Sequence, residues 1–216
     1  MKKNSIHTFK NIILSVFFVL FLFYLILFAV DRIYGKSNKT VTSSDSLTIS
    51  CGDIIFKETS FIMAFSKNPQ YGCFPGHLAI ILNDTAISTR NYSIENLLVA
   101  ESSAFDIKNK EFVPTLKIGS ADNNFGYAHG RLLLIKTHLD ENQKKKLLLY
   151  TNYNLGKPYK LLAQKNDTIY FNCSSFVWNA FKNVTKTDID ADGGSYVLPA
   201  DVLSYFIREK SEIIRF

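Results

Sequence analysis

The sequence predicts an α+β fold, in which an antiparallel sheet packs against helices and one N-terminal transmembrane helix precedes the domain. Two observations carry this prediction. Along the polar part of the chain, short apolar runs of strand length come first, and amphipathic segments of helix length follow. Strands followed by helices are typical of an α+β layer arrangement and not of alternating βαβ units. A long apolar run stands before both.

That apolar run covers residues 12–30 and contains no charged residue. At helical rise it spans roughly 28 Å, about the thickness of the hydrocarbon core of a bilayer. The alternative is a cleaved signal peptide, whose apolar region is usually about 7–15 residues long and ends at a small-x-small site. Residues 28–31 (Phe-Ala-Val-Asp) make a poor site of that kind. We therefore expect an uncleaved signal anchor.

The charges beside the run bear on its orientation. Lysines before the run favour a cytoplasmic tail at residues 1–11 and an exported C-terminal domain, but basic residues after the run oppose them. We expect the exported arrangement, on the periplasmic or extracellular side. The basic residues are Lys2, Lys3 and Lys10 before the run and Arg32, Lys36 and Lys39 after it.

A polar segment rich in Ser and Thr follows, and we interpret residues 31–47 as a linker and residues 48–216 as the globular domain. Within the domain, short apolar runs predict four strands. The third of them ends at Glu101, and no element is assigned to residues 102–127. The predicted strands are 54–56, 77–82, 97–100 and 131–137.

Three helices are expected after the strands. Asp140 is a residue type that begins helices, and the helix after it extends to about Tyr153 before Gly156 stops it. A second helix begins at Cys173. A third covers residues 199–209, with Pro199 in its first turn.

Composition and cysteine spacing exclude several function classes. The net charge of +6 is spread along the chain, and no nucleic-acid-binding motif accompanies it, so no nucleic-acid partner is expected. The three cysteines (Cys51, Cys73 and Cys173) lack the short C-x-x-C spacing of zinc sites, and neither a metal nor another cofactor is predicted. In an exported domain Cys51 and Cys73 can pair, which leaves Cys173 free.

Cys173 stands at the head of a run whose apolar residues recur at helical spacing. A thiol at a helix start lies in the positive end of the helix dipole, which lowers its pKa and favours the thiolate. His77 opens one predicted strand and Glu101 ends the next. Two neighbouring strands can thus present an imidazole and a carboxylate on one side of a sheet, facing the helix that carries the thiol.

Three segments of the chain then resemble a known family. Gly52-Asp-Ile-Ile-Phe56, Gly76-His-Leu-Ala-Ile-Ile81 and Asn172-Cys-Ser-Ser-Phe-Val177 are similar to the signature blocks of NlpC-like papain-fold cysteine hydrolases. The cysteine block comes last here, as in the circularly permuted branch, the YiiX/YebB-like amidase group. Gly156-Lys-Pro-Tyr159 matches a further stretch of that branch. The resemblance implies a permuted papain-like domain.

The resemblance also implies roles for individual residues. Cys173 would be the nucleophile, His77 the general base and acid, and Glu101 the group that orients the imidazole. Tyr159 and Ser174 would lie at the substrate. From the residues alone, Cys173 can equally be a small buried hydrophobe, Glu101 a polar strand end and Tyr159 a core aromatic. Ser175 departs from the family, which has Gly or Glu at that position.

The function expected from these features is a membrane-anchored cysteine hydrolase that cleaves an amide or acyl bond through a thioester at Cys173. Its partners would be the membrane, through the N-terminal helix, and a substrate that is either a peptidoglycan peptide or an acyl lipid. An inactive binding module of the same fold and an acyltransferase are the alternatives.

Overall fold

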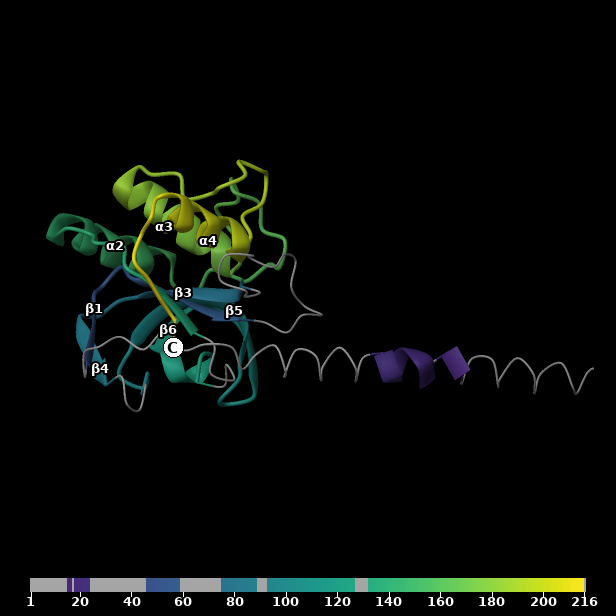
Figure 1. Ribbon diagram of the computed structural model, residues 1–216. Helices are drawn as coiled ribbons and strands as arrows, with labels where there is room; N and C mark the ends of the chain where they lie inside the picture. The colour runs from purple at the N-terminus through teal and green to yellow at the C-terminus, as the bar shows by residue number, and fades with distance from the viewer. Residues whose placement is uncertain are drawn as a thin grey trace, which may run out of the picture. The chain divides into compact units, whose positions relative to one another are not determined.

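A six-stranded antiparallel sheet lies at the centre of the domain, and three helices lie together on one side of it (Figure 1). The computed structural model describes residues 15–16, 18–23, 46–58, 75–88, 93–126 and 132–215. The strand order is β6-β5-β3-β2-β7-β8, and β1 pairs with β4 in a separate two-stranded sheet. In chain order the elements are β1 (Ser46–Ile49), β2 (Ile54–Glu58), β3 (Pro75–Ile81), β4 (Thr85–Ser88), β5 (Leu98–Asp106), β6 (Glu111–Ser120), the 3-10 turn η2 (Ala121–Asn123), β7 (Leu132–Ile135), α2 (Glu141–Asn154), α3 (Cys173–Thr185), α4 (Pro199–Arg208) and β8 (Ile213–Arg215).

The predicted membrane span at residues 12–30 falls largely outside the described residues. Residues 15–16 and 18–23 are helical, with exposed side chains. Across the described ranges, no helix combines the length and the apolar character that a bilayer crossing requires. Cys73, the proposed disulfide partner of Cys51, also lies outside the described residues. Cys51 and Cys173 are both free and buried.

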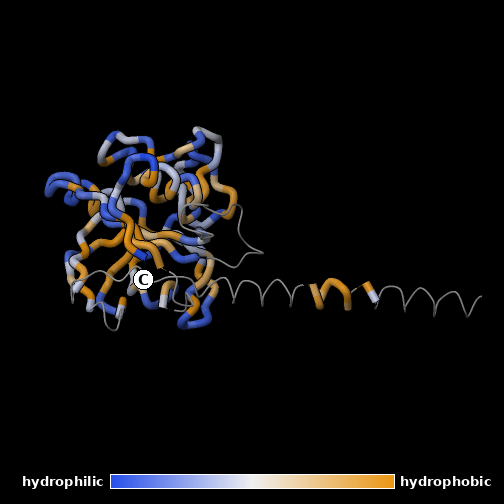
Figure 2. Tube along the Cα trace, viewed as in Figure 1, coloured by the Kyte–Doolittle hydropathy of each residue, from blue (hydrophilic) through white to orange (hydrophobic). Residues whose placement is uncertain are grey.

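Apolar side chains on the two faces of the sheet form two separate clusters. Much of the central sheet is coloured as hydrophobic in Figure 2. Successive residues of a strand point to opposite faces, so β3 contributes to both clusters. Leu78 and Ile80 belong to the cluster that includes the inner faces of the helices. Ala79 and Ile81 belong to the second cluster, on the other face. Both faces of β3 are therefore covered.

The helix boundaries agree with the signals in the sequence. The Asp140 side chain accepts a hydrogen bond from the Gln143 N–H, and the Gln143 side chain accepts one from the Asp140 N–H, which completes a capping box before α2. That helix ends at Asn154, and Gly156 has a positive φ of 79°. Pro199 is the first residue of α4.

The strand prediction was wrong between residues 102 and 127. The third predicted strand does not end at Glu101, because β5 continues to Asp106 and pairs with β6. Polar residues in this part of β5 are buried because each finds a partner: the Ser102 hydroxyl donates to the Phe171 carbonyl at 3.0 Å, for example. The short strands β1, β4 and β8 were also not predicted, and β1 begins at Ser46, inside the predicted linker.

Candidate active site

The start of α3 fixes the position of Cys173. Asn172 has an extended backbone, and its side-chain oxygen accepts the Ser175 N–H at 2.7 Å. In return, the Asn172 N–H donates to the Ser175 hydroxyl at 2.9 Å. This capping box makes Cys173 the first helical residue, where the backbone N–H has no partner within the helix. Ser175, which departs from the resembling family, is thus a capping residue here.

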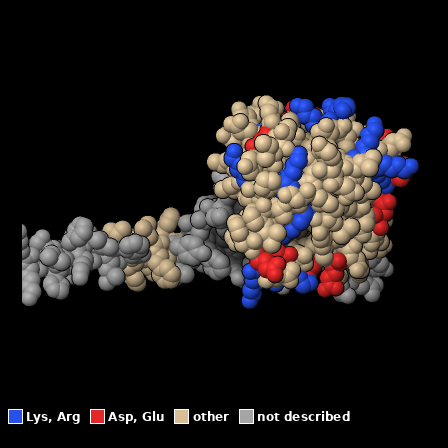
Figure 3. Space-filling model, turned by 180° about the vertical axis from the view of Figure 1, so that it is seen from behind, with Lys and Arg blue, Asp and Glu red and all other residues tan. Residues whose placement is uncertain are grey.

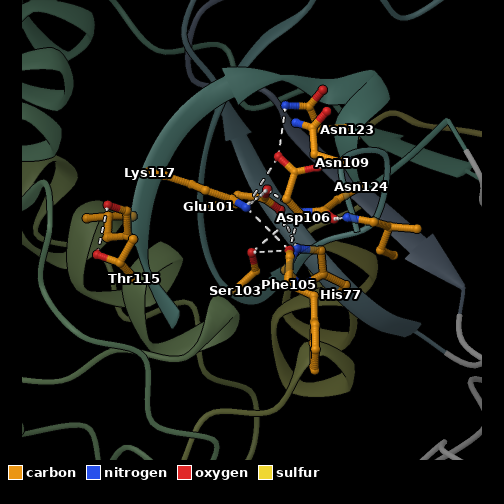
Figure 4. Close-up of polar contacts among 12 residues, drawn as sticks. His77, Glu101, Ser103, Phe105, Asp106, Asn109, Thr115, Lys117, Asn123 and Asn124 are labelled. Carbon is orange, nitrogen blue, oxygen red and sulfur yellow. Dashed lines mark hydrogen bonds and ion pairs between the residues drawn. The ribbon is translucent and has the colours of Figure 1, made fainter. Parts of the chain in front are cut away.

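Two neighbouring strands bring His77 and Glu101 together. His77 lies near the start of β3 and Glu101 near the middle of β5, and the distance between Nε2 of His77 and Oε2 of Glu101 is 2.6 Å (Figure 4). The Glu101 side chain is almost fully buried, whereas that of His77 is 20% exposed. Since Nε2 is bonded to Glu101, Nδ1 is the ring nitrogen left for the thiol of Cys173.

The site lies where the two apolar clusters meet. Cys173 belongs to the cluster on the helix side, whereas the ring of Phe125, which lies 5.3 Å from that of His77, belongs to the cluster on the other face. The hydrogen bond between His77 and Cys173 links the imidazole to the helix that carries the thiol. Register shifts interrupt the regular ladder in both β2 and β5 close to His77. Such irregularities redirect side chains and are common beside active sites.

The three side chains shift one another's protonation. Burial alone would raise the pKa of Cys173, but its hydrogen bond with His77, the charge of His77 and a backbone hydrogen bond from Leu78 lower it below its ordinary value. Burial alone would lower the pKa of His77, but its bonds with Cys173 and Glu101 raise it to about 9. The lowered pKa of Cys173 and the raised pKa of His77 together favour a thiolate and an imidazolium at neutral pH.

Glu101 keeps its negative charge despite its burial. Burial would raise the pKa of this carboxyl group, yet the hydrogen bond and charge of His77, followed by the hydrogen bond from Asn124, hold the pKa below its ordinary value. Lys117 adds a positive charge 3.9 Å from Oε1. The carboxylate therefore faces the imidazolium as a charged partner.

Asn124 is a site residue that the sequence did not reveal. Its side-chain nitrogen donates to Oε1 of Glu101, and its side-chain oxygen accepts the Ile107 N–H at 2.9 Å (Figure 4). The second bond fixes which end of the amide faces the carboxylate. Asn124 is 3% exposed. It thus orients the carboxylate that orients the imidazole.

Tyr159 and Ser174, the two residues expected at the substrate, lie in different environments. Tyr159 lines a cavity next to His77, and burial together with the negative charge of Cys173 raises the pKa of its phenol to about 12. Ser174 is 1% exposed, and its hydroxyl donates to the Val197 carbonyl at 2.8 Å. That bond turns the Ser174 hydroxyl towards the protein, and a hydrogen bond between Ser174 and Cys173 contributes to the lowered pKa of the thiol.

The cavity beside His77 has a volume of about 390 Å³. Much of its wall is apolar, and two of the wall residues, Phe105 and Leu161, are 58% and 63% exposed. This combination of apolar walls and a few polar groups is typical of small-molecule sites. The cavity is lined by Lys57, Glu58, Gly76, His77, Ser103, Ala104, Phe105, Ile107, Asn124, Tyr159 and Leu161.

Metal-ligating side chains gather elsewhere in the domain. The carboxylates of Asp190, Asp192 and Asp201 lie within 4.8 Å of one another, and Asp190 forms an ion pair with Lys165. The lysine therefore already supplies a cation to this group. In the part of the chain that the structure describes, no metal-ligating group of three includes Cys173 or His77.

Comparisons with known proteins give one result. No family model matches the chain, and no curated protein matches it in sequence. The crystal structure of metalloprotein YiiX from Escherichia coli O157:H7 (DUF1105) superposes with a TM-score of 0.44 and 16% sequence identity, over 77% of this chain and 88% of that one.

Proposed function

We propose that this protein is a cysteine hydrolase that cleaves an amide or acyl bond through a thioester at Cys173. The observation that carries the proposal is the contact of Cys173 with His77, whose far nitrogen is bonded to the buried Glu101. A nucleophile, a base within reach of it and a third group that orients the base are the three parts that nucleophilic catalysis needs. The permuted papain-like arrangement implied by the sequence blocks is part of the same proposal.

The reaction proceeds in two halves. The Cys173 thiolate attacks the carbonyl carbon, and the imidazolium of His77 donates its proton to the departing amine or alkoxide as the thioester forms. Backbone N–H groups at the start of α3 stabilise the oxyanion, because the first turn of a helix leaves them without intrahelical partners. Neutral His77 then removes a proton from water, which attacks the thioester and releases the acid.

The surroundings of the site bear on the substrate and the location. The apolar walls of the cavity favour a substrate with an apolar acyl group over a purely polar wall peptide. Together with the apolar N-terminal segment, they support an enzyme anchored in the membrane, and the proposal of an exported domain rests on the lysines that precede that segment. On the face drawn in Figure 3, Lys and Arg lie scattered over uncharged surface and form no continuous basic stripe.

The test is the pH dependence of iodoacetamide labelling at Cys173, followed by peptide mapping of the full-length protein in detergent. An activated pair labels well below the ordinary thiol pKa of about 8.5, and His77→Ala then slows labelling at pH 6.5 by about a hundredfold, because only about one thiol in a hundred is ionised there. Esters and amides are then screened for turnover. An ordinary titration that ignores His77 would instead indicate a binding module.

A further inference from the structure

Lys57 stands directly opposite His77 in the register of β2 and β3. Opposite residues of an antiparallel pair point to the same face, with Cβ atoms roughly 4.5–5.5 Å apart. Both side chains also line the cavity of about 390 Å³. The ammonium group of Lys57 is therefore presented to the same space as the imidazole.

The partners of Lys57 leave part of its hydrogen-bonding capacity unused. Nζ donates to the backbone carbonyl of Asn124 at 2.9 Å, and an ammonium group has three donors. No carboxylate of the described ranges forms an ion pair with Lys57. Glu101 acts on it only through its charge, since its oxygens bind His77 and Asn124.

Among the described residues, the one carboxylate that shares the cavity wall with Lys57 is already neutralised. Glu58 binds the guanidinium of Arg215 at 2.7 Å. Burial removes part of the hydration of the Lys57 ammonium group and thereby lowers its pKa. A partly desolvated cation beside apolar walls gains most from an anion that enters the cavity.

We propose that Lys57 binds an anionic group of the substrate, a carboxylate or a phosphate, and holds it close to the bond that Cys173 attacks. This inference rests on the function proposed above and narrows its substrate class to acyl compounds that carry a negative charge near the scissile carbonyl. The apolar walls formed by Phe105, Ile107 and Leu161 contact the uncharged remainder of the substrate.

The first experiment compares two alkylating reagents of nearly equal size, anionic iodoacetate and neutral iodoacetamide. In both reactions the Cys173 sulfur bonds to the reagent's CH₂ carbon and iodide leaves. The measurement is the ratio of the two rate constants at Cys173 in the full-length protein, so any general loss of reactivity cancels. Lys57→Met keeps the length of the side chain and removes its charge.

We expect the iodoacetate-to-iodoacetamide ratio to fall about tenfold or more in Lys57→Met, the magnitude of a charge-assisted hydrogen bond. The control is Lys182→Met, which removes a positive charge that lies over the Trp178 ring and does not line the cavity. There the ratio should stay within about twofold of the wild-type ratio, because the ionic contact to the reagent is kept. An unchanged ratio in Lys57→Met overturns the proposal.

The same data separate this inference from the proposed function. If both reagents label Cys173 slowly and His77→Ala does not change the rates, the activated cysteine is rejected. The iodoacetate-to-iodoacetamide ratio still tests whether Lys57 binds an anion. Fast labelling with a ratio that ignores Lys57 would reject only the anion site.

A second experiment tests the anion site with substrates that the enzyme hydrolyses. The substrates are p-nitrophenyl butyrate and the p-nitrophenyl monoester of succinate, which differ by a terminal carboxylate. The wild type should favour the succinyl ester in kcat/KM by about tenfold, and Lys57→Met should abolish that preference. No preference in the wild type contradicts a carboxylate ligand. Protection of Cys173 by inorganic phosphate, present in the wild type and lost in Lys57→Met, would assign the anion as a phosphate.

Discussion

Two buried cysteines of the domain differ in the group that faces each thiol. Cys51 lies in the turn before β2, is 5% exposed, and has an N–H that donates to the carboxylate of Asp84 at 2.8 Å. Burial, followed by the negative charge of Asp84, raises the pKa of its thiol to about 11. Cys173 is 9% exposed and has a lowered pKa, because His77 lies against it.

Burial therefore tends to raise the pKa of both thiols, and the neighbouring side chain decides whether the pKa is finally raised or lowered. A carboxylate adds to the effect of burial at Cys51, whereas an imidazole held by Glu101 reverses it at Cys173. Cys51 is thus an internal reference for every experiment on Cys173, since both thiols are measured in one molecule.

The largest expected difference between the two thiols is catalytic. Cys173→Ala should lower kcat/KM for any ester or amide found in the screen by about a thousandfold or more, because the covalent route is lost. Cys51→Ala should keep the wild-type rate within about twofold and cost about 1 kcal/mol in unfolding free energy. Steady-state kinetics on both variants is the measurement. Turnover that survives in Cys173→Ala contradicts the proposed function.

Glu101→Gln should reduce the difference in reactivity between Cys173 and Cys51, because it acts on Cys173 through His77. Loss of the carboxylate charge lowers the pKa of His77, and fewer molecules then hold the thiolate and imidazolium at neutral pH. The alkylation rate of Cys173 at pH 7 should fall by about tenfold to a hundredfold, where tenfold corresponds to one pKa unit. Peptide mapping of Cys51 in the same sample is the control, since its rate should not change. Equal alkylation of Cys173 in variant and wild type would show that Glu101 has no electrostatic role.

The raised pKa of Cys51 should lower the free energy of unfolding at alkaline pH. Its raised pKa means that the folded protein keeps a proton that the unfolded chain loses, so the stability from this group is complete below the ordinary pKa and is lost as pH rises from about 9 to about 11. Two pKa units correspond to about 3 kcal/mol at most. Urea unfolding of wild type and Cys51→Ala across that range measures the difference. Parallel pH curves for the two proteins would contradict the raised pKa.

Asn124→Ala should produce a smaller change at Cys173. The Glu101 carboxylate loses one fixed donor, and alkylation of Cys173 at pH 6.5 should slow by up to about tenfold as the pH profile moves upward. Asn123→Ala is the matched control, because that neighbouring amide donates to Asp106 and not to Glu101. A pH profile that does not move while stability falls would limit Asn124 to a structural role.

The smallest effect is expected from Ser175→Ala. It removes one bond of the capping box before Cys173, which should cost about 0.5–1 kcal/mol in unfolding free energy and shift the alkylation profile only slightly. Thr185→Ala, at the other end of α3, removes a hydroxyl that bonds to the Phe181 carbonyl and should leave the profile unchanged. Equal shifts in the two variants would show that the helix start has no special effect on Cys173.

Signals within a few residues of each other predicted much of the fold. The cap at Asp140, Pro199 at the start of α4 and the apolar periodicity after Cys173 all depend on neighbours in the chain, and the structure agrees with them. The buried runs that became β2, β3 and β7 were equally readable from their apolar residues.

What the sequence did not predict depends on contacts between distant residues. The second half of β5 reads as a polar loop, because Ser102, Ser103 and Asp106 are unfavourable in a buried strand unless partners elsewhere satisfy them. Asn124 bonds to Glu101 only because β5 and β6 fold back on each other and η2 follows. No sequence pattern near Asn124 indicates its hydrogen bond to Glu101.

The burial of an ionised Glu101 has a consequence for the whole proposed reaction cycle. At rest, the thiolate, the imidazolium and the carboxylate sum to one net negative charge. After acylation, the thioester and the neutral imidazole carry none, and Glu101 again leaves one. Each half-reaction therefore moves protons but leaves the net charge of the enclosed site constant. No additional counter-ion has to enter or leave to balance the three catalytic groups, and the barrier avoids the cost of creating a new charge on them in a poorly hydrated space.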